Sequence, residues 1–365
     1  MLLPDESPAP VFEILDLAST SDRRRWLALW ESWPAREVFA HPGYLGLFAS
    51  DSSQPLCATL RLGEARVLYP FLFRDLSAQP WAKGTTPLAD ITSPYGQGGA
   101  VAWGADDRDV LAAEFWRAFD AWAFDNHVVS EFVRLPLFEE DLLADSAERL
   151  HEFDCVVRSL EPSLDELWMD FKHKVRKNVG KAQRNNLQVE VDTDGSRLDG
   201  FVDVYAHTME RRCAAKWYSF SRSFFESLID NLRGQFAFFH TTLNGRAVST
   251  ELVLISSSTI YSYLGGTLRS AFEFRPNDLL KYEIMRWGKD QGMRRFLMGG
   301  GHGSNDSIYR FKLSFAPRGS VPFFTGRRVL EGSAYDRLVA DRRGFAETQG
   351  EAWQPQSRFF PSYRG

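Results

Sequence analysis

Two stretches of the chain carry the same hydrophobic pattern, in which two β-rich runs flank a turn. The first stretch covers residues 59–73 with its turn at Gly63, and the second covers residues 241–255 with its turn at Gly245. Asn244 precedes Gly245, and Asn-Gly is a strong signal for a two-residue hairpin because both residues tolerate positive φ. The pattern therefore predicts one β-hairpin in each half of the chain.

Each hairpin is followed by a further strand candidate, a loop, a helix and a strand. The hydrophobic spacing predicts a helix over 109–126 and a strand over 128–135 in the first half. In the second half it predicts a helix over 277–291 and a strand over 295–298. Each half thus reads as an α/β unit with a mixed sheet, which favours an internal duplication. The alternative is that any two mixed α/β segments share a hairpin and a helix.

The remaining segments add elements to both ends of the second half. A helical lead-in is predicted over 164–186 and a further helix over 198–212. The last part of the chain is mixed, with a strand near 321–325, a helix near 335–343 and irregular structure over 354–365.

Length and composition agree with two domains of a globular protein. The chain has 365 residues, of which 44% are hydrophobic and 25% charged. At roughly 150 residues per domain, this length corresponds to about two domains. The net charge of -5 argues against a protein that coats nucleic acid, so any contact with nucleic acid needs a local basic patch.

The N-terminal residues and the cysteines indicate a cytoplasmic protein. No basic segment followed by an apolar run opens the sequence, and no apolar run approaches the ~20 residues of a membrane-spanning helix. The cysteines Cys57, Cys155 and Cys213 are few and far apart, which argues against a disulfide framework and for a reducing compartment. The sequence contains no Cys-x-x-Cys pair, so a zinc site of that kind is not supported.

The densest basic segment lies at residues 171–187. Its positive residues are Lys172, Lys174, Arg176, Lys177, Lys181 and Arg184, with no carboxylate among them. On a helix these residues would form a positive stripe able to bind phosphates by charge and counterion release. A solvated helix face is the alternative.

Two glycine-rich loops are further candidates for ligand contact. Residues 90–99 combine three glycines with a proline and Tyr95, and residues 297–306 place four glycines around His302. Such loops let a ligand approach the backbone, although plain tight turns have the same composition. Neither loop has a phosphate-binding fingerprint, and two potential ligands, His302 and Asp306, are weak support for a metal.

Lys312 follows the second loop and is flanked by Phe311 and Leu313. A lysine between apolar residues either extends its charge to solvent or directs it into a cleft. It is therefore a candidate functional residue.

Several of these segments, taken in order, resemble the FemABX family of tandem-GNAT aminoacyltransferases. The resemblance covers about residues 60–330 and is carried by residues 309–315, the basic segment 174–182, residues 208–214 with Tyr218, residues 261–266 and the loop 93–99. It implies an α/β fold, with mixed α+β sheets, of two tandem GNAT-like domains. The first would span 1–158 and be completed by the tail 320–365 packing back on it, and the second would span 159–319.

The resemblance also implies an activity. FemABX enzymes transfer an amino acid from aminoacyl-tRNA to an amine, typically on a peptidoglycan precursor for the cell wall. Lys312 is at a functional lysine of that family and is expected to be catalytic. Arg211 or Arg212 would contact the phosphates of the precursor or the donor. Substrate-binding residues expected around a cleft are Tyr95, Asp90, Tyr218 and Tyr263, and the basic helix would steer the tRNA.

The expected chemistry needs no metal or redox cofactor, because an aminoacyl ester is already activated and the enzyme mainly positions the reactants and stabilises the oxyanion. The chain departs from cell-wall members of the family in lacking a long helical hairpin arm, which leaves open an acceptor other than theirs. Two alternatives stay open: an acyl-CoA-dependent GNAT enzyme, and a non-catalytic GNAT-like binding module. Against the first, residues 269–278 contain no glycine with which to cradle a pyrophosphate.

Overall fold

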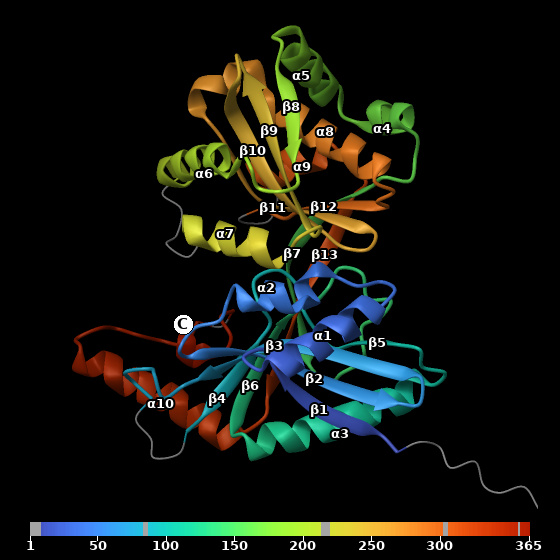
Figure 1. Cartoon of the computed structure of the whole chain (residues 1–365). Helices are drawn as coiled ribbons and strands as arrows, with labels where there is room; N and C mark the ends of the chain where they lie inside the picture. Colours follow the sequence, from blue (N-terminus) through green and yellow to red (C-terminus); the bar gives the residue numbers. More distant parts are fainter. Residues whose placement is uncertain (1–8, 83–86, 213–219, 302–305, 357) are drawn as a thin grey trace, which may run out of the picture. The chain divides into compact units, whose positions relative to one another are not determined.

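The computed structural model describes most of the chain as two compact α/β units (Figure 1). The described residues are 9–82, 87–212, 220–301, 306–356 and 358–365. Unit 1 comprises Met1–Pro34, Phe39–Glu152 and Phe323–Gly365, and unit 2 comprises Ala35–Val38 and Phe153–Pro322. Residues Phe323–Gly365 at the end of the chain thus belong to the first unit.

Unit 1 is built on a mixed sheet with the strand order β1-β2-β3-β4-β6-β13. The strands are β1 (Val11–Asp16), β2 (Ser53–Leu62), β3 (Ala65–Asp75), β4 (Ala89–Thr92), β6 (Val128–Arg134) and β13 (Ser320–Val329), with β5 (Val101–Trp103) paired to β3. Its helices are α1 (Thr20–Ser32), α2 (Pro42–Gly46), α3 (Arg108–Asp125) and α10 (Gly332–Thr348), with 3-10 turns at Val38–Ala40 and Ser362–Arg364. β4 and β6 are parallel. The predicted hairpin, helix and strand of the first half are all present.

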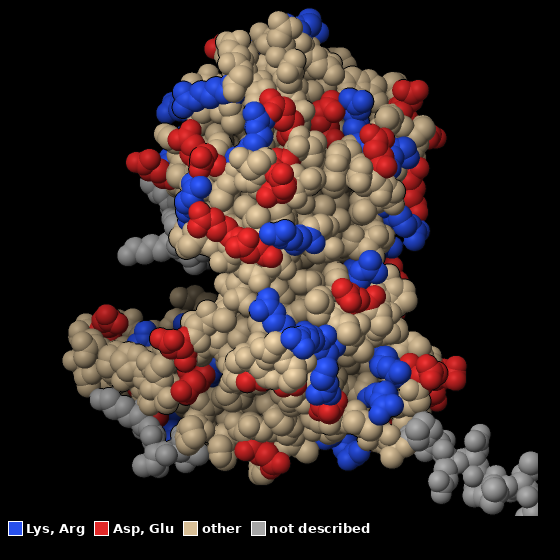
Figure 2. Space-filling model, in the orientation of Figure 1, with Lys and Arg blue, Asp and Glu red and all other residues tan. Residues whose placement is uncertain are grey.

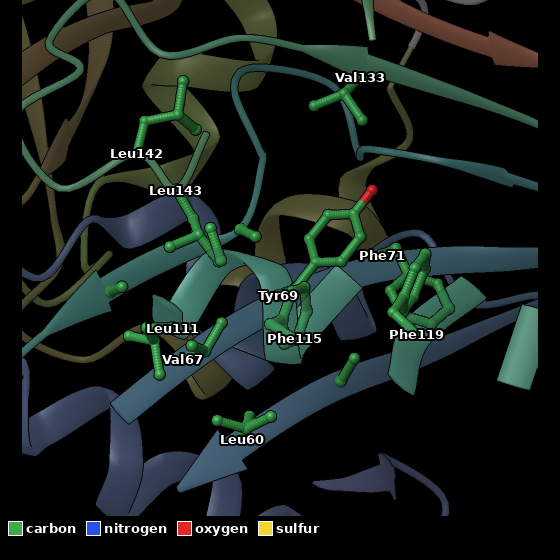
Figure 3. Packing of buried hydrophobic residues seen from close by; sticks show 14 of the residues in the cluster. Leu60, Val67, Tyr69, Phe71, Leu111, Phe115, Phe119, Val133, Leu142 and Leu143 are labelled. Carbon is green, nitrogen blue, oxygen red and sulfur yellow. The ribbon is translucent and has the colours of Figure 1, made fainter. Parts of the chain in front are cut away.

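Helix α3 packs on one face of this sheet through aromatic side chains. Tyr69 and Phe71 of β3 point toward Phe115 and Phe119 of α3, and all four side chains are fully buried (Figure 3). The ring of Phe119 lies 5.2 Å from that of Tyr69 and 5.8 Å from that of Phe71. Edge-to-face and tilted pairs of this kind add to the free energy gained from burial alone. On the other face, α10 and the C-terminal turn form a smaller core around Tyr363.

Unit 2 is a mixed sheet with the strand order β7-β12-β11-β10-β9-β8. The strands are β7 (Glu148–Ser159), β8 (Gln188–Asp192), β9 (Phe236–Leu243), β10 (Arg246–Ile255), β11 (Thr259–Thr267) and β12 (Arg295–Gly299). The helices are α4 (Leu164–Asp170), α5 (His173–Arg184), α6 (Leu198–Arg212), α7 (Arg222–Asn231), α8 (Pro276–Asp290) and α9 (Ser307–Leu313), with a 3-10 segment at Arg269–Phe274. β11 and β12 are the parallel pair, so this unit repeats the order of hairpin, strand, helix and parallel strand.

The helical lead-in predicted over 164–186 consists of two helices, α4 and α5. Helix α4 begins with a capping box at Ser163, and it ends where Phe171 takes an extended conformation. The Phe171 side chain is buried and packs 5.5 Å from the ring of Phe315. The amide of Lys172 then donates to the carbonyl of Ser314, at 3.0 Å. Helix α4 therefore ends at the residue whose aromatic side chain is buried in the core.

The surface shows charges of both signs. On the face shown in Figure 2, basic and acidic side chains are interspersed within each unit. Within the described ranges, no helix combines the length and the hydropathy needed to cross a bilayer.

Candidate active site

In unit 2, the parallel strands β11 and β12 separate after a short pairing. Their register joins Thr259 to Arg295, Ile260 to Phe296 and Tyr261 to Leu297, and it ends there. β11 continues to Thr267, while β12 ends at Gly299, whose φ of 76° is in the left-handed region. Ligands of α/β sheets bind at the carboxyl ends of parallel strands, so this point is the natural place to look for a site.

A β-bulge in β11 lies just beyond this separation. Leu252 of β10 pairs with Leu264, whereas the next residue, Val253, pairs with Ser262, so Tyr263 is the extra residue. A bulge redirects the side chains around it and is common beside active sites. Tyr263, one of the predicted substrate-binding residues, is half-buried at this position.

Beside the bulge, Lys281 of α8 forms a buried ion pair with Glu251 of β10. The Lys281 Nζ donates to Glu251 Oε1 at 2.6 Å and to Ser262 Oγ at 2.9 Å. Each of the two charged residues has only 4% of its surface exposed. The ammonium also lies 5.4 Å from the centre of the Phe296 ring. A charged network therefore sits under the strands at the point where they separate.

Lys312 of α9 lies next to this network. Its Nζ donates to the carbonyl of Gly300 at 2.6 Å, directly after the end of β12. Burial, assisted by the positive charge of Lys281, lowers the pKa of Lys312 to about 8, while the negative charges of Glu251 and Asp306 act in the opposite direction. The structure thus brings the predicted catalytic lysine to the separated strand ends.

Asp306 is the N-cap residue of helix α9. The carboxylate of Asp306 caps the helix by accepting from the amide of Tyr309 at 2.7 Å. Asp306, weighed from the sequence as a metal ligand, thus has a capping role. His302, the other residue weighed for that role, lies outside the described residues. Among the residues that the structure describes, no cluster of potential metal ligands is present.

The chemistry of the site follows from the protonation of these groups. With a pKa of about 8, Lys312 can donate a hydrogen bond as an ammonium or accept a proton as an amine near neutral pH. Cys155 is close enough for its charge to act on Lys312, but burial raises the pKa of its thiol to about 12. A neutral thiol is a poor nucleophile, so of these two groups Lys312 is the better candidate for a reactive group.

Arg211 and Arg212, two predicted binding residues, lie at the end of α6. Contacts within unit 2 hold the Arg211 side chain. Arg211 Nη2 donates to the carbonyl of Thr267 at 3.3 Å, and its guanidinium lies 5.1 Å from the centre of the Phe272 ring. Partial burial and the charges of Arg212 and Arg269 lower the pKa of Arg211. Three arginines therefore gather near the end of β11. Tyr218 lies outside the described residues.

The two predicted binding residues of unit 1 lie at β4 and in the loop after it. Asp90 is fully buried and accepts from Arg74 Nε at 2.6 Å, from Arg364 Nε at 2.5 Å and from the Tyr363 hydroxyl at 3.2 Å. These contacts give Asp90 a structural role in holding the C-terminal residues. Tyr95 is half-buried, and its carbonyl accepts from the Tyr44 hydroxyl. Substrate binding by Asp90 and Tyr95 stays a prediction.

Most of the basic segment forms the amphipathic helix α5. One of its basic residues, Arg176, does not belong to the exposed positive stripe that the sequence predicts. Val175, Val179 and Ala182 are buried, and the exposed positive residues are Lys172, Lys174, Lys177, Lys181 and Arg184. Arg176 instead donates to the carbonyls of Met169 at 2.8 Å and Phe171 at 2.7 Å, at the end of α4. Its guanidinium satisfies carbonyls that the helix end leaves unpaired, so it connects the two helices.

Sequence reasoning missed Lys281 and Glu251, although a signal was present. Glu251 precedes the apolar run of β10, and Lys281 follows Leu279 and Leu280 on the buried face of α8. A charge inside an apolar pattern has to be paired when it is buried. The partner, however, is thirty positions away in the sequence.

The comparisons with known proteins agree with this architecture. Residues 169–313 match the family model described as an acetyltransferase (GNAT) domain. No curated protein sequence matches the chain significantly. The crystal structure of FemX is similar with a TM-score of 0.64 and 14% identity, covering 86% of this chain and 98% of that one.

Two further solved structures are similar over most of their length. L-PGS from Bacillus licheniformis has a TM-score of 0.51 and 13% identity, covering 90% of this chain and 98% of that one. The C-terminal domain (DUF2156) of a protein assigned as a lysylphosphatidylglycerol synthetase, from Agrobacterium fabrum, has a TM-score of 0.51 and 13% identity, covering 87% and 96%. The chain therefore has a FemABX-like tandem-GNAT fold, in which residues 169–313 form a GNAT domain.

Proposed function

We propose that this protein is an N-acyltransferase of FemABX type, which transfers an aminoacyl group from aminoacyl-tRNA to an amine acceptor. The acceptor would be a peptidoglycan precursor or another small amine or peptide. The amine nitrogen attacks the ester carbonyl, a C–N bond forms and the C–O bond breaks. The tRNA ribose hydroxyl leaves with one proton, and the attacking amine loses one. The step is balanced without a metal or a redox cofactor.

The observation that carries this proposal is the position of Lys312 at the separated ends of β11 and β12. Its ammonium is fixed by the Gly300 carbonyl, and burial, together with the charge of Lys281 close by, lowers the pKa of Lys312 to about 8. A fixed donor in a partly buried position stabilises the oxyanion that forms when the amine attacks the ester. Lys312 is the proposed catalytic residue.

The N-terminus of α8 disfavours a CoA pyrophosphate as the donor group. Pro276 supplies no amide at the first helical position, and Asp278 places a carboxylate in the first turn. That carboxylate is held by the Asn178 amide at 3.0 Å. A negative charge already at the positive end of the helix competes with a bound phosphate. This arrangement supports the choice of aminoacyl-tRNA over acyl-CoA.

The exposed basic residues of α5 support an RNA donor as well. Helix α5 packs on α8, so its basic face belongs to the same unit as Lys312. The name of the Agrobacterium fabrum protein denotes a lysyl-lipid product, which is consistent with aminoacyl chemistry on this fold. The acyl-CoA enzyme and the non-catalytic binding module remain the two alternatives.

The test offers the protein both donors in parallel. Charged tRNAs with labelled amino acids and labelled acetyl-CoA are each incubated with the protein and an amine-rich cell extract, and loss of the acyl group is followed. We expect loss of label from aminoacyl-tRNA, its appearance in an amide, and no such transfer by Lys312→Met. Lys289→Met is the matched control, since Lys289 Nζ donates to the carbonyls of Leu160 and Glu161, outside the candidate site.

Each other outcome decides against the proposal. Consumption of acetyl-CoA alone would identify the acyl-CoA enzyme. Consumption of neither donor would favour the binding module. Full activity of a correctly folded Lys312→Met would remove Lys312 from the mechanism.

A further inference from the structure

One face of the sheet of unit 1 carries buried arginines that the proposed reaction does not use. Val133 of β6 points into the α3 core (Figure 3), so its neighbours Phe132 and Arg134 point to the opposite face. In the pairing of β6 with β13, Arg134 lies opposite Thr325 and Phe132 lies opposite Arg327. Arg134 and Arg327 therefore share one face of the sheet.

Two aromatic rings connect these arginines. The Arg134 guanidinium lies 5.1 Å from the centre of the Phe132 ring, and the Arg327 guanidinium lies 5.7 Å from that of Phe360. The two rings are 6.4 Å apart. Phe360 belongs to the C-terminal segment, which therefore covers part of this face.

Arg74 and Arg364 add two more positive charges to the same face. Both donate to Asp90, and Asp90 is aligned with Ser130 of β6, two positions before Phe132. Arg74 is close enough to Arg134 for its charge to lower the pKa of Arg134, in addition to the larger effect of burial. The four arginines thus form one cluster, which we call the arginine face (Arg74, Arg134, Arg327 and Arg364).

The carboxylates that pair with the arginine face do not balance its charge. Asp90 pairs with Arg74 and Arg364, and Glu152 pairs with Arg327 at 3.2 Å. Tyr363 adds no negative charge, because burial and Asp90 raise the pKa of its hydroxyl. Among the described side chains, four guanidinium groups therefore face two paired carboxylates, an excess of two positive charges. An excess charge in a partly buried place is costly unless an anion accompanies it.

Several of the donors in this cluster have no partner. Within the described chain, Arg327 Nε and Arg364 Nη2 are buried without a hydrogen bond. No side chain in the described ranges forms a hydrogen bond or ion pair with the Arg134 guanidinium, which remains partly exposed. Buried polar groups in folded proteins are almost always satisfied. Unsatisfied donors beside a partly exposed arginine are available to an anion that enters from solvent.

We propose that the arginine face binds a phosphoryl group, with Arg134 as the residue that meets the ligand. Near neutral pH a phosphate monoester carries close to two negative charges and a pyrophosphate two or more, whereas a single carboxylate carries one. Guanidinium groups match phosphate oxygens in pairs of parallel hydrogen bonds. The site belongs to unit 1 and does not depend on the acyl transfer proposed for unit 2.

The test uses the full-length protein and three probes at constant ionic strength: inorganic phosphate, inorganic pyrophosphate and acetate. Binding is measured by calorimetry, and thermal unfolding is measured with and without each probe. We expect phosphate or pyrophosphate to bind at least tenfold more tightly than acetate and to raise the unfolding temperature. The variant Arg134→Met should bind the same probe at least tenfold more weakly.

The unfolding temperature without a probe separates binding from a structural role. Arg134→Met removes an uncompensated charge, so its unfolding temperature in an anion-free buffer should equal or exceed that of the wild-type protein. Arg61→Met, on an exposed arginine of β2, is the control and should leave binding unchanged. Equal binding of acetate and phosphate, or equal phosphate binding by Arg134→Met and wild type, would overturn the proposal.

Discussion

Lys281 Nζ and Glu251 Oε1 lie 2.6 Å apart inside unit 2, in a place where almost no water reaches either side chain. The pair joins α8 to β10 beneath the point where β11 and β12 separate. Lys312 lies within range of both charges, and they act on it in opposite directions. The ion pair therefore contributes, together with burial, to the electrostatic environment of the proposed catalytic lysine, and it also joins a helix to a sheet.

The first prediction concerns this ion pair. Glu251→Gln leaves the Lys281 ammonium buried without a carboxylate, and we expect the free energy of unfolding to fall by about 3–5 kcal/mol. Urea unfolding measures the loss. The double variant Glu251→Leu with Lys281→Met removes both charges and should recover most of the stability. An equal loss in the single and the double variant would show that packing, not charge, accounts for the effect.

The second prediction concerns the dependence of stability on pH. The pKa of Lys312 is lowered to about 8 in the folded protein from 10.5 in the unfolded chain. Between these values the unfolded state binds more protons, so the contribution of Lys312 to stability rises with pH from about 8 to 10.5 and is constant below 8. The rise is on the order of 3 kcal/mol. We expect the difference in unfolding free energy between wild type and Lys312→Met to change across this interval.

The control for that measurement is Lys289→Met, which keeps Lys312. Its difference from wild type should stay flat over the same pH interval. A flat difference for Lys312→Met as well would mean that Lys312 titrates normally and is not buried as described.

The third prediction concerns the exposed basic residues of α5. Reversing the charges of Lys174, Lys177 and Lys181 to Glu should weaken binding of aminoacyl-tRNA and make the affinity less dependent on salt. Each lost phosphate contact reduces the slope of log affinity against log salt by about 0.7–0.9. Filter binding at a series of salt concentrations measures both effects. An unchanged slope would place the RNA elsewhere.

Arg176 provides an internal contrast within the same helix. Because its guanidinium donates to the carbonyls at the end of α4, Arg176→Gln should lower stability by about 1 kcal/mol, the net contribution of hydrogen bonds that are not fully buried. The salt dependence of RNA binding should be unaffected, which separates the structural arginine from the exposed lysines.

The fourth prediction concerns Asp90 and the C-terminal residues. Asp90→Asn removes the carboxylate that accepts from Arg74, Arg364 and Tyr363. We expect a loss of about 3–5 kcal/mol and faster proteolysis of the C-terminal segment, because two arginines lose their buried partner. Thermal unfolding and limited proteolysis measure these effects. Slow proteolysis in a destabilised variant would show that the tail is held by its aromatic contacts instead.

The sequence predicted the local elements of both units well. The hairpins at Gly63 and Gly245 and the helices over 109–126, 198–212 and 277–291 follow from turn residues and from the spacing of apolar positions. These signals are local, because a helix or a hairpin needs only the residues within it. The break at Phe171 could not be predicted in the same way, since it depends on the burial of that ring against Phe315.

In the candidate site, too, features that depend on sequence neighbours could be predicted, and features that depend on distant elements could not. Lys312 could be found from its apolar neighbours and from the family resemblance. Arg176 could not be separated from the other basic residues of its segment, because its partners lie on the preceding helix. The pairing of Lys281 with Glu251 was also out of reach, because it connects elements thirty residues apart.

The sequence by itself determined that the chain contains two α/β units with similar element order, one basic helix and a lysine set among apolar residues. Periodicity and turn chemistry suffice for that, because they act over a few residues. Only the tertiary structure decided which charges are buried together, which arginine caps a helix and which donors have no partner. Those properties depend on strand register and on packing between distant elements. The function of a charged residue therefore depends on which groups lie next to it in the folded protein.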